Sequence, residues 1–324
     1  MGSGRRITLV SHGPNCLDGI TCAVVAARYF AGCDFQAIFS SNHDIDDTLL
    51  EYNPDDPAAS ELWITDISWR ETATDRHLNA LVEAGAGVYW VDHHKSALDR
   101  RDGGGLDVSF TDHVLDMSYA ASRLLFNYLR DRAAKRGESK PGLLALENLV
   151  MLADDVDRWI LARDGSRRLA LAVRAMEHND AYRVLLSMDS NITYGHELTQ
   201  ALEKAERDMA DSLKLARSTR VATDVAGLGI CIVAAECVDY AGEIADNWKK
   251  EYDNAVFALF DRRSGAISLR RTPSCQIDLA SLASRFDGGG HAAAAGCTMQ
   301  LPEDGRSTEI AIRLAEIVGS EGSS

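Results

Sequence analysis

The sequence contains little proline and has no long polar tract. Only 6 of its 324 residues are proline and 46% are hydrophobic, which is typical of a chain that folds almost throughout. It also lacks any run of about 20 apolar residues, so we expect no membrane-spanning helix and no membrane partner. Residues 1–6 are polar, and the short apolar run after them is typical of a strand rather than of a signal peptide.

Closely spaced cysteine pairs are also missing. The cysteines are Cys16, Cys22, Cys33, Cys231, Cys237, Cys275 and Cys297. An odd number at irregular spacing, without a CxxC pair, is neither a disulfide framework nor a zinc ribbon. The pattern favours a reducing compartment, and we therefore predict a cytoplasmic protein.

Basic residues are outnumbered, with 34 Lys and Arg against 49 Asp and Glu and a formal net charge of -15. This balance argues against sequence-independent binding of long duplex nucleic acid. It is compatible with a local basic pocket for a small phosphorylated ligand, since a few arginines on an acidic surface favour compact substrates.

The order of apolar runs predicts an α/β fold of two domains. Short buried strands at 6–11, 34–39, 61–65 and 87–91 alternate with helical patterns, which is typical of a doubly wound parallel sheet. We assign residues 1–195 to this domain and 221–324, where short strands return, to a smaller α/β domain. Residues 196–220 read as one long amphipathic helix, either a connector, which we favour, or part of a core.

Four separated segments supply residue types that bind metal ions, and three of them follow a predicted strand. The residues are His12, Cys16, Asp18, Asp66, Asp92, His93, His94, Asp154, Asp155 and Asp157. Carboxylates together with imidazoles suit Mn²⁺, Mg²⁺ or Fe²⁺ better than a structural zinc ion. Two such ions, roughly 3.5–4 Å apart, can activate a water and stabilise an in-line phosphoryl displacement. Asp66 is the candidate for a carboxylate shared by both ions.

Each of these residues also has a plainer interpretation when taken alone. Asp66 suits a helix N-cap or a turn, and His12 suits a structural histidine. The acidic run at 154–157 is compatible with solvated charges, or with an ion pair to the arginine of Arg158-Trp159. The ordered combination of the four segments is what favours a metal site.

The N-terminal segments together resemble the DHH phosphoesterase superfamily, which includes RecJ-type exonucleases, nanoRNases and family II pyrophosphatases. Residues 92–94 (DHH) follow the strand residues 89–91 (YWV) and form the motif that names the superfamily. They come in the superfamily's order, after the His12 segment and Asp66. The pairs Asp18-Gly19 and Arg158-Trp159, the latter directly after Asp157, resemble the second nanoRNase branch.

The resemblance continues in the C-terminal part of the chain. Residues 285–296 (RFDGGGHAAAAG) are similar to the GGGHxxAAG signature of the DHH-associated domain, and residues 268–271 (SLRR) to its SLRS segment. The likeness therefore covers most of the chain, roughly residues 6–318.

The resemblance implies two divalent cations, with Mn²⁺ as the first expectation. The ligands implied for the first cation are His12, Cys16 and Asp66. Those implied for the second are Asp18, Asp66, His93 and either Asp155, which we prefer, or Asp154. Asp92 would orient its neighbours, and His94 would contact the scissile phosphate, so these two are the implied catalytic residues. Family members often form homodimers, which makes a homodimer an open expectation here.

Cys16 departs from the family, which usually has aspartate at this position. A thiolate favours Zn²⁺ or Fe²⁺ over Mg²⁺, so the identity and occupancy of the first cation stay open. The neighbouring Asn15 offers a carbonyl oxygen as an alternative ligand.

The glycine-rich segment is the predicted substrate site of the C-terminal domain. Gly288, Gly289 and Gly290 would let backbone N–H groups approach a phosphate closely, and His291 and Arg270 would bind the same ligand. The alternative is a plain tight turn before an alanine-rich helix. Arg271 is expected on the opposite face from Arg270 because strand side chains alternate.

These observations predict hydrolysis of a small phosphodiester or phosphomonoester. By resemblance, the substrate is a short single-stranded oligonucleotide, a linear dinucleotide or phosphoadenosine phosphate. The alternatives are a phosphatase for short-chain polyphosphate or pyrophosphate, and a non-catalytic nucleotide sensor in which Cys16 has disabled the first cation site.

Overall fold

The computed structural model describes residues 4–13 and 15–321, which form two compact units, one up to Ala205 and one from Glu206. The boundary falls inside helix α10 (His196–Thr219), which covers almost all of the segment read as one long helix. The outer limits predicted for the two domains, residues 1 and 324, lie outside the described residues. Among the described helices, none has the length and apolar character needed to cross a membrane.

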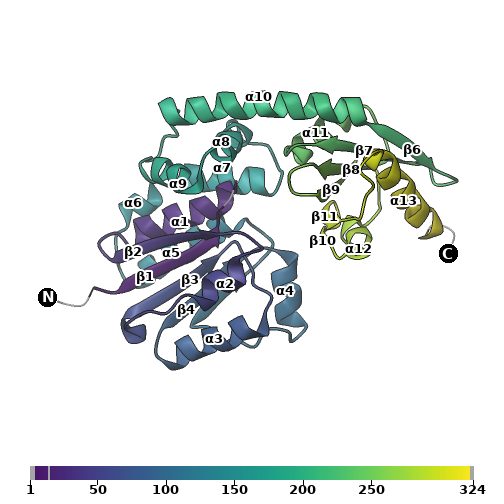
Figure 1. Ribbon diagram of the computed structural model, residues 1–324. Coiled ribbons are helices and arrows are strands. Elements are labelled where there is room, and N and C mark those ends of the chain that lie inside the picture. The colour runs from purple at the N-terminus through teal and green to yellow at the C-terminus, as the bar shows by residue number, and fades with distance from the viewer. Residues whose placement is uncertain (1–3, 14, 322–324) are drawn as a thin grey trace. The chain divides into compact units, whose positions relative to one another are not determined.

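The first unit is built on a five-stranded parallel sheet in the order β2-β1-β3-β4-β5. Figure 1 labels β1, β2, β3 and β4 of this sheet. Its strands are β1 (Arg6–His12), β2 (Asp34–Ser40), β3 (Ser60–Thr65), β4 (Gly87–Asp92) and β5 (Asp112–Leu115). The predicted doubly wound α/β domain is confirmed. The sequence did not predict β5, because this short edge strand begins with the exposed residues Asp112 and His113 and has no apolar run.

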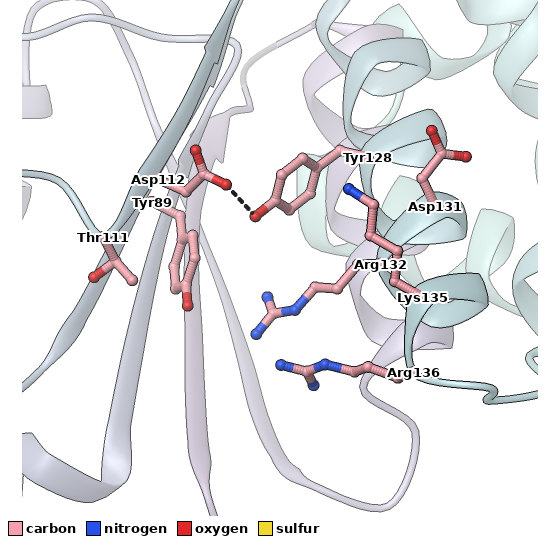
Figure 2. Close-up of a pocket in the computed structure, with 8 residues that line it drawn as sticks. All are labelled: Tyr89, Thr111, Asp112, Tyr128, Asp131, Arg132, Lys135 and Arg136. Carbon is pink, nitrogen blue, oxygen red and sulfur yellow. Dashed lines mark hydrogen bonds between the residues drawn. The ribbon is translucent and has the colours of Figure 1, made fainter.

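Helices cover both faces of this sheet. On one face, α1 (Leu17–Tyr29), α5 (Ala121–Lys135) and α7 (Glu147–Asp157) pack against one another, and Tyr89 of β4 lies toward α5 (Figure 2). On the other face, α2 and α3 share a core with the strands. The remaining helices are α2 (Ile45–Leu50), η1 (Pro57–Ala59), α3 (Thr72–Glu83), α4 (Lys95–Asp102), α6 (Pro141–Leu144), α8 (Ser166–Arg174) and α9 (His178–Leu186). Burial on both faces explains why every residue of β3 is buried.

The register of the parallel strands brings three of the predicted segments to one edge. Ser11 of β1 pairs with Thr65 of β3, and Thr65 pairs with Val91 of β4, so the residues that follow each of them are neighbours. Gly19 lets α1 begin directly against the end of β1, because a Cβ atom there would lie 1.9 Å from the His12 carbonyl oxygen. The metal-binding segments therefore converge at the carboxyl ends of the central strands, where open α/β sheets bind ligands.

The second unit has a six-stranded mixed sheet in the order β10-β11-β9-β8-β7-β6, in which only β7 and β8 are parallel. The strands are β6 (Val221–Val225), β7 (Ile230–Cys237), β8 (Ala255–Asp261), β9 (Ala266–Arg271), β10 (Gly289–His291) and β11 (Ala294–Thr298). Residues 262–265 join β8 to β9 as an antiparallel pair. This sheet and its helices confirm the smaller α/β domain.

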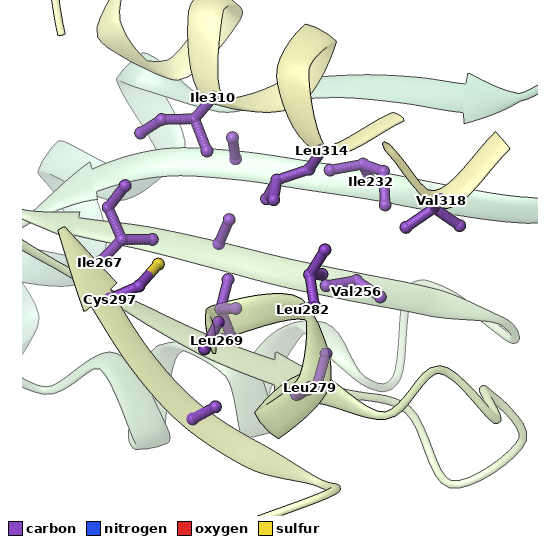
Figure 3. Packing of buried hydrophobic residues seen from close by; sticks show 14 of the residues in the cluster. Ile232, Val256, Ile267, Leu269, Leu279, Leu282, Cys297, Ile310, Leu314 and Val318 are labelled. Atoms are coloured by element: carbon purple, nitrogen blue, oxygen red, sulfur yellow. The ribbon is translucent and has the colours of Figure 1, made fainter. Parts of the chain in front are cut away.

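Two separate cores hold the second unit together. Helices α12 (Leu279–Ser284) and α13 (Arg306–Glu321) pack on one face of the sheet, where Leu314 and Val318 of α13 meet Ile232 and Val256 (Figure 3). Helix α11 (Ala241–Trp248) and part of α10 cover the other face, where the fully buried Trp248 packs near Phe257. Both faces of this sheet are therefore buried in its central strands.

Candidate metal centre

Asp66 lies at the centre of the side chains gathered at the sheet edge. It has a left-handed backbone (φ 58°), its N–H donates to the Val91 carbonyl oxygen at 3.0 Å, and it is only 2% exposed. Its Oδ2 is 3.2 Å from Cys16 Sγ and 3.9 Å from His12 Nδ1, and its Oδ1 is 3.4 Å from His93 Nε2. The two oxygens thus face two different groups, which is the arrangement of a carboxylate that can be shared by two cations.

The described residues contain three groups whose candidate ligand atoms lie within 4.8 Å of one another. The groups are His12, Cys16 and Asp66; Asp66, His93 and His94; and Asp18, His93 and Asp157. The first and third correspond to the two expected cations, with Asp66 next to both. The structure therefore brings together every predicted ligand except the aspartate expected from positions 154 and 155.

The donor atoms of the third group fit a divalent cation. His93 Nε2 is buried and makes no hydrogen bond within the described residues, although oxygens of Asp66 and Asp157 lie 3.4 and 3.3 Å away. A cation among these atoms would satisfy all of them at once. Oxygen and imidazole donors are the set that Mn²⁺ and Mg²⁺ accept.

The charges of the cluster also favour a bound cation. Burial, reinforced by Asp66 and Asp157, raises the pKa of Asp18 well above its usual range. Burial likewise raises the pKa of Asp157 to about 6. Burial alone would lower the pKa of His93, but Asp66, Asp157 and Asp18 outweigh it and raise that pKa to about 9. The carboxylates are therefore crowded, and added positive charge stabilises them.

Asp157, rather than Asp154 or Asp155, lies beside Asp18 and His93. The Asp155 carboxylate accepts hydrogen bonds from the Ala162 and Arg163 N–H groups and the Ser166 hydroxyl. The Asp154 carboxylate accepts from the Ala120 N–H and forms an ion pair with Arg123 at 2.7 Å.

Both carboxylates thus hold loops that follow or face α7, and their geometry does not favour a ligand role. The sequence did contain a clue to this difference. Asp157 is two residues after Asp155, so the two side chains leave the helix on different sides. Arg158 pairs with Asp154 at 3.7 Å, so the arginine does not occupy Asp157.

Asp92 and His94 form a hydrogen-bonded pair beside the cluster. Asp92 is fully buried and accepts from the His93 N–H, His94 Nδ1 and the Ser68 hydroxyl, each at 2.7 Å. Burial would lower the pKa of His94, but Asp92 outweighs it and raises that pKa to about 10. The His94 side chain is 41% exposed. It therefore presents a positively charged ring to solvent, held in place by Asp92.

Cys16 lies where the sequence predicted, at the first group. Its Sγ is the cap of α1, accepting from the Gly19 N–H at 3.3 Å and donating to Asp66 Oδ2 at 3.2 Å. Burial and then the Asp66 charge raise the pKa of the thiol well above its usual range. Asn15, its neighbour, has a left-handed backbone (φ 62°).

Two hydroxyl groups that support the site were not predicted. Ser122 donates from both its N–H and its hydroxyl to Asp18, and Ser68 donates to Asp92. Neither serine belongs to a motif, and only the fold shows that they reach these carboxylates.

The glycine-rich segment of the second unit forms a β-hairpin. A Cβ atom on Gly288 would lie 2.2 Å from the Gly296 carbonyl oxygen, and Gly290 combines φ +141° with a 2.6 Å approach to Ala294. Both glycines are therefore needed for packing against β11, while Gly289 faces open space. Residues 294–298 are a strand, so the alternative of a tight turn before an alanine-rich helix is wrong.

Arg270 and His291 occur on one face of this sheet. His291 of β10 pairs with Ala294 of β11, which pairs with Arg270 of β9, and directly paired residues share a face. The Arg270 Nη1 donates to the Leu269 carbonyl oxygen at 2.8 Å. The register therefore brings together the arginine and the histidine that the sequence assigned to substrate.

Comparison with known proteins completes this description. Residues 234–315 match the DHHA1 domain family. The chain is 30% identical over 310 residues to oligoribonuclease NrnB of Bacillus subtilis strain 168, an alignment that covers 90% of this chain and 72% of NrnB. The chain belongs to the DHH phosphoesterase superfamily. As a DHH phosphoesterase with a DHHA1 domain, it is a hydrolase that acts on phosphoester bonds.

Solved structures share the fold of this DHH phosphoesterase. The DHH domain of a member of a ribosomal protein family matches with TM-score 0.68 and 16% identity, over 98% of this chain and 87% of that one. RecJ of Thermus thermophilus in complex with Mn²⁺ matches with TM-score 0.63 and 16% identity, over 98% of this chain and 52% of RecJ. At such identities the likeness concerns the fold alone.

Proposed function

We propose that this DHH phosphoesterase hydrolyses short oligoribonucleotides or linear dinucleotides with the help of two divalent cations. The observation that carries the proposal is the position of Asp66, whose two oxygens face two separate donor groups. Oligoribonuclease NrnB, the relative reported above, supports the choice of a short RNA. All seven cysteines are free thiols, which supports a place in the reducing cytoplasm.

The proposed ligands follow from the two donor groups. His12, Cys16 and Asp66 would hold the first cation. Asp18, Asp66, His93 and Asp157 would hold the second. When bound, the two cations would supply an activated water and stabilise the charge that develops on the phosphoryl oxygens. Mn²⁺ is the ion that we propose, while the Cys16 sulfur also admits Zn²⁺ or Fe²⁺ in the first position.

The protein's own groups prepare the substrate for attack. Asp92 fixes the ring of His94 through a 2.7 Å hydrogen bond and keeps it protonated. The exposed edge of that ring can donate to a non-bridging phosphate oxygen, which favours the extra negative charge of the transition state. Burial lowers the pKa of His12, which keeps this imidazole in the neutral form that binds a cation.

An exposed aromatic ring supports a nucleotide over a purely inorganic substrate. Trp159 follows Asp157 by two residues, has a left-handed backbone (φ 54°), and is 37% exposed. The Arg167 guanidinium lies 5.6 Å from the ring centroid. A nucleobase can stack on such a ring, whereas polyphosphate gains nothing from it. In the second unit, we propose that Arg270, His291 and the backbone N–H of Gly289 bind a distal phosphate.

The test compares substrates and two variants of one residue. The purified protein with Mn²⁺ is assayed on a diribonucleotide, a chromogenic phosphodiester and tripolyphosphate. We expect the diribonucleotide to be hydrolysed most efficiently, with Trp159→Ala raising its KM and Trp159→Phe, which keeps a ring, leaving KM nearly unchanged. A preference for tripolyphosphate, together with no effect of Trp159→Ala, would replace this proposal by the polyphosphatase alternative.

A further inference from the structure

The first unit contains a cavity that lies apart from the candidate metal ligands. It has a volume of about 420 Å³ and lies between α5 and the strands β4 and β5, as Figure 2 shows. Tyr89 lines it and is three positions before Asp92 of the metal centre on β4, a span of about 10 Å of strand. None of the candidate metal ligands lines this cavity.

Three cationic side chains of α5 and its C-terminal end line this cavity. Arg132 and Arg136 are one helical turn apart, and both guanidinium groups point from α5 toward Tyr89, with Lys135 beside them (Figure 2). Lys135 forms no ion pair in the part of the chain that the structure describes, and the carboxylate nearest to Arg136, that of Glu138, is 4.0 Å away.

Within the described residues, neither carboxylate of the lining forms an ion pair with these three cations. The Asp112 carboxylate accepts a hydrogen bond from the Tyr128 hydroxyl at 2.7 Å. The Asp131 carboxylate is 3.3 Å from Arg130, a residue outside the lining. Each acid therefore has a partner of its own, while the cations remain available to a ligand.

Arg132 is held in place with spare hydrogen-bonding capacity. Its side chain is only 12% exposed, and its Nη1 is buried without a hydrogen-bond partner among the described residues. The guanidinium lies 5.3 Å from the Tyr89 ring centroid, and this ring is fixed by stacking on Trp63. The carboxylate nearest to Arg132, that of Glu61 at 3.5 Å, already accepts from Trp63 Nε1 at 2.9 Å and pairs with Arg5 at 2.8 Å.

We propose that this cavity binds a small phosphate-bearing anion, either inorganic phosphate or the phosphate of a mononucleotide. Two forked guanidinium groups and one ammonium group match the several acceptor oxygens of a phosphate dianion. The volume of about 420 Å³ is in the range of small-molecule sites. Because the cations belong to α5 and not to the metal centre, this binding requires no metal ion.

The experiment measures anion binding to the metal-free full-length protein by titration calorimetry. Inorganic phosphate and adenosine 5′-monophosphate are titrated separately, so that the two sources of the phosphate group are distinguished. We expect saturable binding of at least one of them in the presence of a chelator. The double variant Lys135→Ala/Arg136→Ala changes only exposed side chains, and it should weaken this binding about tenfold or more through the loss of two charged contacts.

Two control variants make the result specific. Arg76→Ala removes an exposed charge of α3 that does not line the cavity, so it should bind as the parent does. Arg270→Ala removes the proposed phosphate-binding arginine of the second unit, so metal-free binding that this variant retains and the double variant loses belongs to the cavity. No metal-free binding by the parent, unchanged binding by the double variant, or loss of all binding in Arg270→Ala would each overturn the proposal.

Discussion

Asp155 and Asp157 lie on the same helix, and the structure predicts opposite consequences of changing them. In Asp155→Asn, an amide NH₂ replaces Oδ2, which now accepts from the Arg163 N–H and the Ser166 hydroxyl. The Ser166 hydroxyl keeps a second acceptor, the Arg163 carbonyl oxygen at 3.1 Å. One donor, the Arg163 N–H, is left without an acceptor, so we expect a loss of about 1–3 kcal/mol. For a unit of this size, that loss lowers Tm by about 2–12 °C.

Asp157→Asn, unlike Asp155→Asn, is not expected to lower the stability of the metal-free protein. The Asp157 carboxylate lies among other acids, and its burial raises its pKa to about 6, so its charge is unfavourable in the metal-free protein. Removing the charge should leave the metal-free Tm unchanged or slightly higher. The parent should gain about 2.7 kcal/mol in Mn²⁺ at a hundred times its Kd. Asp157→Asn should lose most of that gain and nearly all turnover.

The assay is thermal unfolding of the parent and both variants, each with a chelator and with Mn²⁺, followed by hydrolysis of a diribonucleotide. Asp155→Asn should unfold early under both conditions but keep its stabilisation by Mn²⁺. A variant Asp157→Asn that kept the full Mn²⁺ stabilisation would refute the placement of this side chain at the second cation. An Asp155→Asn protein with normal Tm but no Mn²⁺ response would restore the sequence-based expectation.

Further predictions concern single positions of the two units. Cys16→Asp should keep turnover and shift the metal preference toward Mn²⁺ or Mg²⁺, because oxygen replaces sulfur in the first donor group; metal titrations of activity that match the parent would contradict this. In contrast, metal titrations of Cys16→Ala that match the parent would show that the sulfur only fills space beside Asp66. Arg270→Ala should raise KM with little change in kcat if the arginine binds a remote phosphate equally in the ground and transition states; steady-state kinetics that show a loss in kcat alone would place it at the reacting phosphate.

The sequence allowed much of the fold to be predicted where strands carry continuous apolar runs. β1, β3 and β4 have such runs because helices bury both faces of the sheet. β5 was missed because it is an edge strand, which pairs with one neighbour only and is little buried, so its sequence needs no apolar run. The strand β11 was missed because its alanines have little strand propensity of their own, and their pairing with β9 depends on the tertiary structure.

The convergence of the candidate metal ligands was predicted as far as the strand ends determine it. His12, Asp66 and His93 follow paired strand residues, so their convergence follows from the order of motifs and the rule for parallel sheets. The aspartate of α7 was not determined in this way, because the choice depends on the rotation of a helix and on the loop that Asp155 holds. Supporting contacts such as Ser122 to Asp18 depend on residues 104 positions apart.

The most direct test of the account is the number of Mn²⁺ ions bound to the parent and to Asp66→Asn, measured together with diribonucleotide hydrolysis. Asparagine tolerates the left-handed backbone of this position, so the variant should fold and keep its metal-free Tm. If Asp66 is shared by both cations, the parent binds two Mn²⁺ ions per chain, and Asp66→Asn binds neither tightly and has no measurable turnover. An Asp66→Asn protein that still binds two Mn²⁺ ions and hydrolyses the diribonucleotide would contradict the account.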